Sequence, residues 1–403
     1  MKTICIAGKN DIAVAVLAYC IDNYPDLRIV VVCNRNDSGV NSWQRSLLWF
    51  AKKKGIEILS LEDVYGIEDL VFLSTEFDRI IRPEKFLSTR LFNIHFSMLP
   101  EYKGCHTSVL PILQGRDKTG ITFHRMDSGI DTGEIIEQKV IDIDPSDTAF
   151  DLYLKLIAEG TKLVIKNLPV VINGEEVSRP QSFESSTYYP IGYINYKELS
   201  LDVNATSFQI RNQVRAFGFR PYQLLSWNGI RYVECEITDT RSVNKPGYVI
   251  EDTDIYTLIS TVDYDVKLYK DVLTDVLDAI SEGRNDAAIA LLRSPKIINA
   301  KNDKGWSPLT VAVYNADVKV FEYLVSNGAD IFVKNNNGTT LLMYAKNAGI
   351  NTGDWTIFRR LLELGLDPGQ KDYEELTLKD YVLDSGCTGA VPDDVKEAMG
   401  IDG

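Results

Sequence analysis

The sequence has few of the residues that bind metals in proteins. Its three histidines lie at positions 95, 106 and 124, its six cysteines are scattered over 403 residues, and no two cysteines have CxxC spacing. A structural zinc site needs closely spaced ligands, and a disulfide framework is typical of small secreted domains. We therefore expect no metal, and reduced, mostly buried thiols in a cytoplasmic protein.

Long apolar segments are also missing. No uncharged apolar run approaches the roughly 18 residues that a membrane helix needs. The apolar start of the chain is interrupted by Lys9 and Asp11 before the core of a signal peptide could form. The sequence thus predicts no membrane insertion and a cytoplasmic location.

An excess of basic residues is absent. Lys and Arg number 43 against 57 Asp and Glu, which gives a net charge of -14. Nucleic acids and anionic membranes are bound by clustered basic side chains, so the balance disfavours both as partners. A small anionic ligand is not excluded, because a few local Arg or Lys side chains suffice to bind it.

The first 170 residues alternate short apolar strands with helices. Leu27–Cys33 is a continuous apolar run, as expected of a strand that is buried on both faces of a parallel sheet. The alternation predicts an α/β domain with a doubly wound, Rossmann-type sheet. The turn after the first strand reads AGKND and not GxGxxG, so a dinucleotide-binding function is disfavoured.

Later segments show different patterns. A long helix is expected over Ser146 to Asn167, with Ser146 as its N-cap and Pro169 at its end. Turn clusters and short apolar runs in the following segment predict a small β-rich domain that carries one helix. We therefore expect three domains, at 1–170, 171–266 and 267–403.

A repeat with an offset of 33 residues marks the last domain. The segment 303–309 (DKGWSPL) recurs at 336–342 (NNGTTLL). The repeat resembles the ankyrin family, because SPLTVA at 307–312 stands where that family has TPLHxA, and a Gly-Ala-Asp turn follows at 328–330. The resemblance implies an all-α array of helix pairs, with Asp271–Leu292 as a degenerate capping repeat.

Three polar side chains share one face of an expected strand. Asn93, His95 and Ser97 alternate with apolar residues, so they point the same way at the carboxyl end of the strand. Ligands of α/β folds bind at this edge of the sheet. A histidine can move protons near neutral pH, and an asparagine amide can donate to a developing oxyanion. A polar cluster that only satisfies its own hydrogen bonds remains an alternative.

The segment from Met126 to Glu134 is rich in glycine and acidic residues. It predicts a tight turn with exposed backbone groups, which can recognise a flat heterocycle. Asp131 in this turn can pair with an imidazole, orient it and raise its pKa. An ordinary acidic hairpin loop remains an alternative.

The two motifs together resemble the formyltransferases that use N10-formyltetrahydrofolate. That family has Asn-x-His-x-Ser-x-Leu-Pro, found here at 93–100, and Asp-x-Gly-x-Asp-Thr-Gly, found at 127–133. The resemblance implies that Asn93, His95 and Asp131 are catalytic and that no metal is needed. It also implies a folate site near both motifs, for which the candidates are Phe92, Ser97, Met98, Leu99, Asp127, Gly129, Thr132 and Gly133.

The C-terminal part of the chain bears on the substrate. The formyltransferases of initiator tRNA carry a basic C-terminal domain, whereas here the ankyrin array has more acidic than basic residues. The chain resembles the sugar N-formyltransferases instead, which implies a dTDP-linked amino-dideoxyhexose as the substrate. The combination with a C-terminal ankyrin module resembles the sugar N-formyltransferases that act on dTDP-3-amino-3,6-dideoxyglucose. This resemblance implies that substrate and a role in O-antigen, or lipopolysaccharide, biosynthesis. A 4-amino isomer stays open, and we expect a homodimer.

Candidate contacts for the nucleotide-sugar lie in two regions. Arg side chains suit a diphosphate and aromatic faces suit thymine, and both types occur on and after an expected helix near Ser207–Phe217. The candidates there are Arg211, Arg215, Phe217, Arg220 and Tyr222, and further ones are Lys9, Asn10 and Glu76. A solvated helix face with core aromatics would explain the first set equally well.

Trp306 occupies an unusual position in the ankyrin array. It follows the glycine of the first turn, at the edge of an expected hairpin, where a large aromatic side chain is costly to expose. With Asp303 and Lys304 it predicts a regulatory surface, for a partner protein or for a second nucleotide-sugar. Packing of Trp306 against the adjacent repeat, in a purely structural array, is the alternative.

Overall fold

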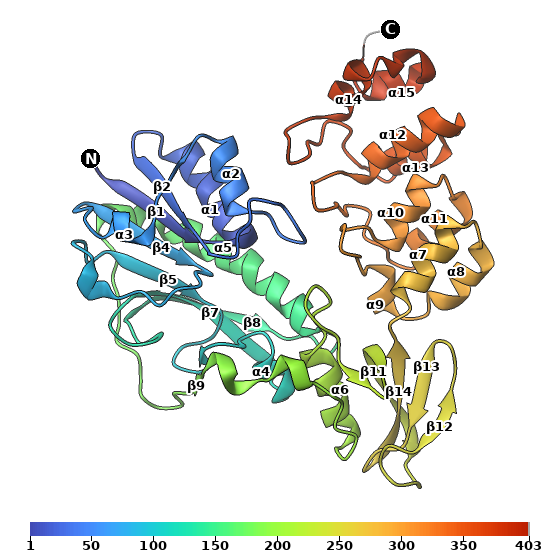
Figure 1. The fold of residues 1–403 in the computed structure, drawn as a ribbon, viewed down its shortest axis with the longest axis horizontal. Helices are drawn as coiled ribbons and strands as arrows, with labels where there is room; N and C mark the ends of the chain where they lie inside the picture. The colour runs from blue at the N-terminus through green and yellow to red at the C-terminus, as the bar shows by residue number, and fades with distance from the viewer. Residues whose placement is uncertain (402–403) are drawn as a thin grey trace. The chain divides into compact units, whose positions relative to one another are not determined.

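The computed structural model describes residues 1–401, and the chain divides into two compact units, Met1–Trp227 and Asn228–Gly403 (Figure 1). The predicted division into three domains stays a prediction. Among residues 1–401, no helix combines the length and apolarity that crossing a membrane requires.

A seven-stranded mixed sheet forms the centre of the first unit. Its strands are β1 (Thr3–Gly8), β2 (Arg28–Cys33), β3 (Glu57–Ile58), β4 (Leu70–Thr75), β5 (Leu91–His95), β7 (Lys118–Arg125) and β8 (Ile135–Asp142), in the order β3-β2-β1-β4-β5-β7-β8. The first five strands are parallel to one another. Strand β7 runs antiparallel to β5, and β8 runs antiparallel to β7. The predicted doubly wound α/β fold is confirmed, and its carboxyl edge carries the polar residues of β5.

Helices and short connecting elements complete the unit. They are α1 (Asn10–Asn23), α2 (Leu47–Lys53), α3 (Leu61–Val64), η1 (Pro83–Lys85), β6 (Lys103–Gly104), α4 (Leu110–Leu113), α5 (Ala149–Asn173), β9 (Tyr188–Tyr189), η2 (Ile191–Tyr193), η3 (Tyr196–Glu198), α6 (Ser207–Ala216) and β10 (Ser226–Trp227). Strands β6 and β9 pair in parallel and form a two-stranded sheet.

The long helix α5 differs from its prediction at both ends. Its N-cap is Thr148, whose side chain accepts from the Asp151 amide while the Asp151 carboxylate accepts from the Thr148 amide. The Ser146 hydroxyl instead donates to Asp144 in the turn before the helix. The helix continues through Pro169 to Gly174, which has the left-handed conformation (φ 76°) that favours glycine at a helix end. The expected start and end of this helix were therefore wrong.

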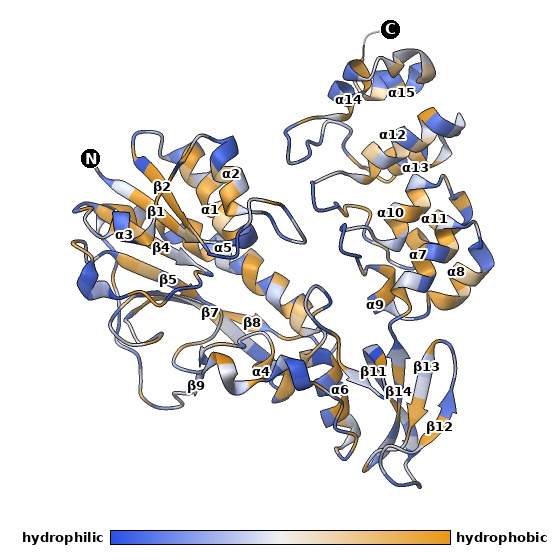
Figure 2. Ribbon diagram, viewed as in Figure 1, coloured by the Kyte–Doolittle hydropathy of each residue, from blue (hydrophilic) through white to orange (hydrophobic). Residues whose placement is uncertain are grey.

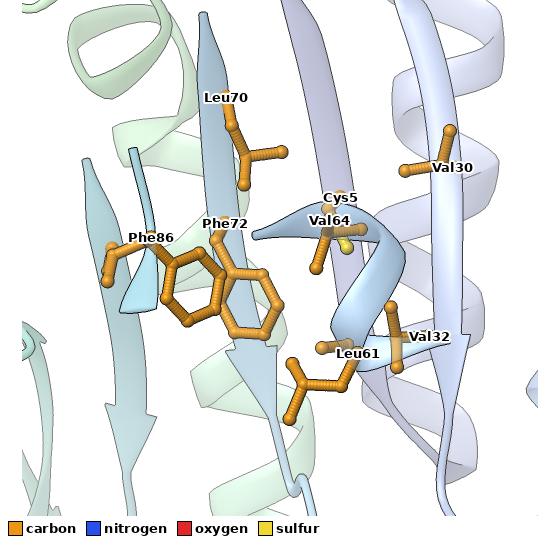
Figure 3. Packing of buried hydrophobic residues seen from close by; sticks show 10 residues of the cluster. Cys5, Val30, Val32, Leu61, Val64, Leu70, Phe72 and Phe86 are labelled. Carbon is orange, nitrogen blue, oxygen red and sulfur yellow. The ribbon is translucent and has the colours of Figure 1, made fainter. Parts of the chain in front are cut away.

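A hydrophobic cluster packs against one face of the parallel strands. Phe72 on β4 is fully buried, and its ring centroid lies 5.3 Å from that of Phe86 (Figure 3). Val30, Val32 and Cys5 from the neighbouring strands belong to the same cluster. Apolar residues dominate the central strands (Figure 2), as their burial on both faces requires.

The second unit joins an antiparallel sheet to an array of helix pairs. Its strands are β11 (Ile230–Arg241), β12 (Val249–Asp252), β13 (Tyr256–Ile259) and β14 (Tyr264–Lys270). Its helices are α7 (Leu273–Ser281), α8 (Asn285–Leu291), α9 (Pro295–Ile298), α10 (Pro308–Tyr314), α11 (Val318–Ser326), α12 (Leu341–Thr352), α13 (Thr356–Glu363), α14 (Leu378–Asp384), η4 (Cys387–Ala390) and α15 (Asp393–Ala398). The predicted β-rich segment and ankyrin-type helical array are both confirmed.

The turns of the array explain its repeated glycines. Gly305 and Gly338 occupy equivalent turns with φ of 79° and 78°, a conformation that other residues rarely adopt. A Cβ atom on Gly305 would lie 2.7 Å from the amide nitrogen of Asn336, in the turn of the next repeat. The repeat spacing thus brings successive turns into close contact.

Truncation of Phe72 tests the core of the first unit. We expect Phe72→Ala to lower its free energy of unfolding by about 3–5 kcal/mol, because the change removes a fully buried ring and leaves a cavity. Urea unfolding measures the difference, and Ile80→Ala, at a side chain that is 75% exposed, is the control with a change of about 0.5 kcal/mol or less. Equal effects of the two substitutions would contradict this description of the core.

Candidate active site

Strand pairing places three polar residues together at the carboxyl edge of the sheet. Asn93 and His95 lie on β5, and in the antiparallel pairing of β5 with β7 the residue opposite Asn93 is His124. Residues directly opposite each other in such a pair share one face of the sheet. The edge therefore carries an amide and two imidazoles side by side.

Asp131 completes this group from the loop between β7 and β8. It has a left-handed backbone conformation (φ 53°), and its Oδ2 accepts from the backbone amide of Gly104 at 2.8 Å. The same oxygen lies 3.5 Å from Nδ1 of His95, and Oδ1 lies 3.4 Å from Nδ2 of Asn93. The structure therefore brings together all three residues that were predicted to be catalytic.

His124 fixes the orientation of the Asn93 amide. Its Nδ1 lies 2.7 Å from the carbonyl oxygen of Arg125, which can only accept, so Nδ1 carries the proton. Its Nε2 is therefore free to accept from Nδ2 of Asn93 at 3.1 Å. Burial lowers the pKa of His124 to about 4, so the ring is neutral at neutral pH. Sequence analysis did not select His124 as a site residue, because only the strand register reveals its position.

His95 is held between a carbonyl and a carboxylate. Its Nε2 donates to the carbonyl oxygen of Tyr102 at 2.8 Å, which leaves Nδ1 facing Asp131. A proton taken up at Nδ1 would therefore give an imidazolium with an acceptor at each nitrogen. Such a ring can accept a proton from a reacting group without a second base.

The residues predicted to bind folate fall into two groups. Phe92 is buried, with its ring 5.7 Å from that of Phe123, and the Ser97 hydroxyl donates to the Glu101 carbonyl, so these side chains serve packing. The backbone at Leu99 is likewise engaged, because its amide donates to Thr122 Oγ1. Strand β5 ends at His95, so Ser97 lies beyond the strand on which it was expected, as do Leu99 and the partly exposed Met98.

The second group forms the exposed turn beside Asp131. Asp127 accepts from the amide of Gly129 at 3.0 Å and from the hydroxyl of Thr132 at 2.6 Å, which closes the turn. A Cβ atom on Gly133 would lie 1.9 Å from the carbonyl oxygen of Arg125, so only glycine fits there. This turn presents backbone groups next to the catalytic candidates, as a flat heterocycle would require.

Two of the predicted sugar contacts meet where β1 and β4 end. Asn10 Nδ2 donates to Glu76 at 3.2 Å, and the Tyr153 hydroxyl donates to the same carboxylate at 2.8 Å. Burial raises the pKa of the Glu76 carboxyl. Asn10 and Glu76 both have positive φ, at 66° and 59°. Lys9 adjoins this network, and its amide donates to the Thr75 carbonyl.

Aromatic side chains extend this network. Tyr222 is 62% exposed and stacks on Phe219, with ring centroids 5.1 Å apart, and the ring of Trp43 lies perpendicular to it with centroids 5.5 Å apart. Trp43 in turn contacts Tyr153, the hydroxyl partner of Glu76. Sequence analysis selected Tyr222 and Glu76 but missed Trp43 and Tyr153, which carry no motif.

The helix α6 candidates have different surroundings. Arg215 is buried and donates to the carbonyls of Asp147 and Asp144 and to the side chain of Asn212, so its donors are engaged within the chain. Phe217 is also buried. Arg211 lies over the ring of Phe208, and Arg220 is partly exposed. The structure thus does not bring Arg215 and Phe217 to an open surface.

Side chains that bind metal ions do not gather in the described part of the chain. Among residues 1–401, no three or more His, Cys, Asp or Glu side chains are placed to hold a metal ion. The cluster around Asp131 contains two imidazoles and one carboxylate. One nitrogen of each imidazole is hydrogen-bonded to a backbone carbonyl: Nε2 of His95 to Tyr102, and Nδ1 of His124 to Arg125.

The neutral state of His124 predicts a loss of stability in acid. Above its ordinary pKa of 6.5 the ring is neutral in both folded and unfolded chains, whereas between 6.5 and about 4 only the unfolded chain takes up the proton. We expect the urea midpoint to fall from pH 7 to pH 5, and to fall less in His124→Gln. An equal fall in both proteins would contradict the burial of a neutral His124.

Comparison with known proteins gives a consistent result. The family model described as formyl transferase matches residues 68–168, and the model for ankyrin repeats (3 copies) matches residues 276–372. The methionyl-tRNA formyltransferase of Staphylococcus aureus (strain MW2) is 28% identical over 235 residues, which are 55% of this chain and 75% of that protein.

Two solved structures match a larger part of the chain. WlaRD, a sugar 3N-formyl transferase solved in the presence of dTDP and 5-N-formyl-THF, is 42% identical with a TM-score of 0.62, covering 67% of this chain and 98% of its own. The N-formyltransferase of Helicobacter canadensis, solved with folinic acid and dTDP-3-aminofucose, is also 42% identical with a TM-score of 0.62, covering 67% of this chain and 100% of its own. Because this chain is 42% identical to the two relatives over 98% and 100% of their lengths, it belongs to the sugar N-formyltransferases.

Proposed function

We propose that the protein transfers a formyl group from N10-formyltetrahydrofolate to the amino group of dTDP-3-amino-3,6-dideoxyglucose. The observation that carries this proposal is the convergence of Asn93, His95 and Asp131 at the carboxyl edge of the sheet. Membership of the sugar N-formyltransferases supports the choice of acceptor, and the product would enter O-antigen biosynthesis. We also propose that the enzyme acts in the cytoplasm as a homodimer, which light scattering on the purified chain would test.

The descriptions of two relatives support the proposed position of the acceptor amine. One is described as a sugar 3N-formyl transferase and the other was solved with dTDP-3-aminofucose, and both are 42% identical to this chain. These descriptions favour a 3-amino sugar over a 4-amino isomer, which remains the alternative acceptor.

The reaction needs a proton acceptor and a partner for negative charge. The sugar amine attacks the formyl carbon, so that a new C–N bond forms and the carbonyl oxygen becomes negative. Asn93 donates to this oxygen after releasing its longer contact, 3.4 Å, with Asp131. His95 takes the amine proton at Nδ1, next to the Asp131 carboxylate. As the bond between the carbon and N10 breaks, this proton passes to N10 of the leaving tetrahydrofolate.

Recognition of the two ligands uses separate parts of the edge. We assign the folate ring to the backbone of the 126–133 turn, next to Asp131. Thymine is assigned to the exposed face of Tyr222, because its other face already stacks on Phe219. Lys9, Arg211 and Arg220 supply positive charge for the diphosphate, and Asn10 with Glu76 supplies hydrogen-bonding groups for the sugar.

Mass spectrometry of the product tests the proposed acceptor. The enzyme is mixed with N10-formyltetrahydrofolate and either dTDP-3-amino-3,6-dideoxyglucose or its 4-amino isomer. A mass gain of one carbonyl group (CO) is expected with the 3-amino sugar and little or none with the 4-amino sugar. The reverse preference would overturn the substrate assignment, and a rate that chelators abolish would overturn metal-free transfer.

Substitution of the catalytic candidates tests the mechanism. We expect His95→Asn and Asp131→Asn each to lower the turnover rate by roughly 10²-fold or more without unfolding the protein, because each removes a part of the proton acceptor. Asp26→Asn, at an exposed carboxylate, is the control and should keep the wild-type rate. A His95→Asn enzyme that turns over at nearly the wild-type rate would refute this mechanism.

A second ligand site on the ankyrin array is the less direct part of the proposal. Trp306 is partly exposed and lies 5.4 Å from the ring of Tyr314 and 5.6 Å from that of Tyr344. Lys304 lies over the indole, with Nζ 5.9 Å from the ring centroid, and Asp303 is its neighbour. A flat base can stack on such a cluster while Lys304 faces a phosphate. Binding there would be coupled reciprocally to binding of the substrate. A protein partner, or packing alone, is the alternative.

Equilibrium dialysis with dTDP-3-amino-3,6-dideoxyglucose separates these alternatives. A regulatory site predicts two bound molecules per full-length chain, and one in Trp306→Ala with unchanged melting temperature. Phe332→Ala, at an aromatic side chain that is 63% exposed in the same array, should still bind two. One bound molecule in the wild type, together with a lower melting temperature of Trp306→Ala, would leave Trp306 with a packing role.

A further inference from the structure

Residues 179–189, here called the strap, contact two loops of the candidate active site, one that contains Asp131 and one that contains Gly104. At its start, Arg179 exchanges backbone hydrogen bonds of 2.8 and 2.9 Å with Ile135, the first residue of β8. At its end, β9 pairs with β6. Neither sequence motif includes any residue of the strap. One continuous segment therefore contacts the loop that contains Asp131 and the loop that contains Gly104.

Gln181 is the strap residue that holds the Asp131 loop. Its Nε2 donates to the carbonyl oxygen of Asp131 and to that of Gly133, both at 2.8 Å. Among residues 1–401, these are the hydrogen bonds that the two carbonyls accept. The Asp131 backbone has a positive φ of 53°, a conformation that a non-glycine residue keeps only when its surroundings fix it. One side-chain amide thus restrains the backbone on both sides of Thr132.

The far end of the strap holds the partners of Asp131 and His95. Thr187 Oγ1 accepts from the amide of Tyr102 at 2.7 Å, and the amide of Cys105 donates to Tyr189 at 2.8 Å. Between these two contacts, the Tyr102 carbonyl accepts from His95 and the Gly104 amide donates to Asp131. The strap therefore fixes the acceptor for one ring nitrogen of His95 and the donor to the Asp131 carboxylate.

We propose that Gln181 is a positioning residue, which holds the 131–133 loop so that the Asp131 carboxylate faces His95 during formyl transfer. The proposal rests on the proposed function. Asp131 Oδ2 lies 3.5 Å from His95 Nδ1, so a small displacement of the loop would separate these two atoms beyond the range of direct interaction. Misplacing a catalytic group by about 1 Å can cost roughly 10²-fold in rate. The Gln181 side chain donates to backbone carbonyls, so it acts on the catalytic group through the backbone.

The chain offers a matched control for a substitution at Gln181. Gln213 on α6 also binds the backbone of a loop through its side-chain amide, because it accepts from the amide of Asp202 at 2.9 Å and donates to the carbonyl of Asp202 at 3.2 Å. No hydrogen bond links this loop to the catalytic candidates in residues 1–401. Removing either glutamine thus frees one loop, and only one of the two loops contains Asp131.

The experiment compares Gln181→Met with Gln213→Met in the full-length enzyme. Methionine keeps the approximate shape and removes both donors. We expect Gln181→Met to lower kcat by roughly 10-fold to 10²-fold, with KM for the nucleotide-sugar within about twofold of wild type. Gln213→Met should keep the wild-type kcat, and both variants should show similar melting temperatures. A wild-type kcat in Gln181→Met would overturn the proposal.

Two further variants keep the test decisive. Gln181→Glu also removes both donors. It places a negative charge at the position of Oε1, an atom that is buried without a hydrogen-bond partner. We therefore expect its kcat to fall at least as far as that of Gln181→Met. In an Asp131→Asn background, Gln181→Met should lower kcat by less than about twofold, because the residue acts through Asp131. If Gln181→Met lowered kcat by the same factor in the Asp131→Asn background as in the wild type, the proposal would be overturned. An inactive wild-type enzyme would instead refute the proposed function, so the two failures are distinguishable.

Discussion

A single carboxylate, that of Asp131, organises the candidate active site. It faces two imidazoles, one amide and one backbone N–H group, and these come from β5, from β7 and from the loop that contains β6. Each contact depends on close backbone packing: a Cβ atom on Gly104 would lie 2.4 Å from the carbonyl oxygen of Tyr189. The chemistry of the site therefore depends on loops that pack tightly enough to hold one charge in place.

Two carboxylates at the same edge of the sheet have different surroundings. Glu76 is a partly exposed residue whose carboxyl lies among Asn10, Tyr153 and aromatic rings, and the loss of hydration there raises the pKa of that carboxyl. Asp131 lies among donors that belong to the proposed catalytic group. This difference between the surroundings of Glu76 and Asp131 agrees with the proposed function, in which the sugar binds where β1 and β4 end and a proton moves beside β5.

The sequence was most informative where chemistry follows a local period or motif. The shared face of Asn93 and His95 follows from the alternation of a strand, and the strong apolar runs predicted the sheet. His124 and Gln181 were not predictable in this way, because their roles depend on strand register and on a strap from a distant segment. Arg215 resembled a phosphate ligand on the helix, yet its guanidinium binds the carbonyls of Asp144 and Asp147, which no local pattern indicates.

The most direct test of this account is the protonation of its histidines, read by NMR of the full-length protein labelled with [15N]histidine. Only three histidines need assignment, which His95→Asn and His124→Gln would provide. We predict that His124 stays neutral with its proton on Nδ1 from pH 7 down to pH 5, and that His95 carries a proton on Nε2 throughout. A His124 that is already charged at pH 6, or that carries its proton on Nε2, would contradict the arrangement around Asp131.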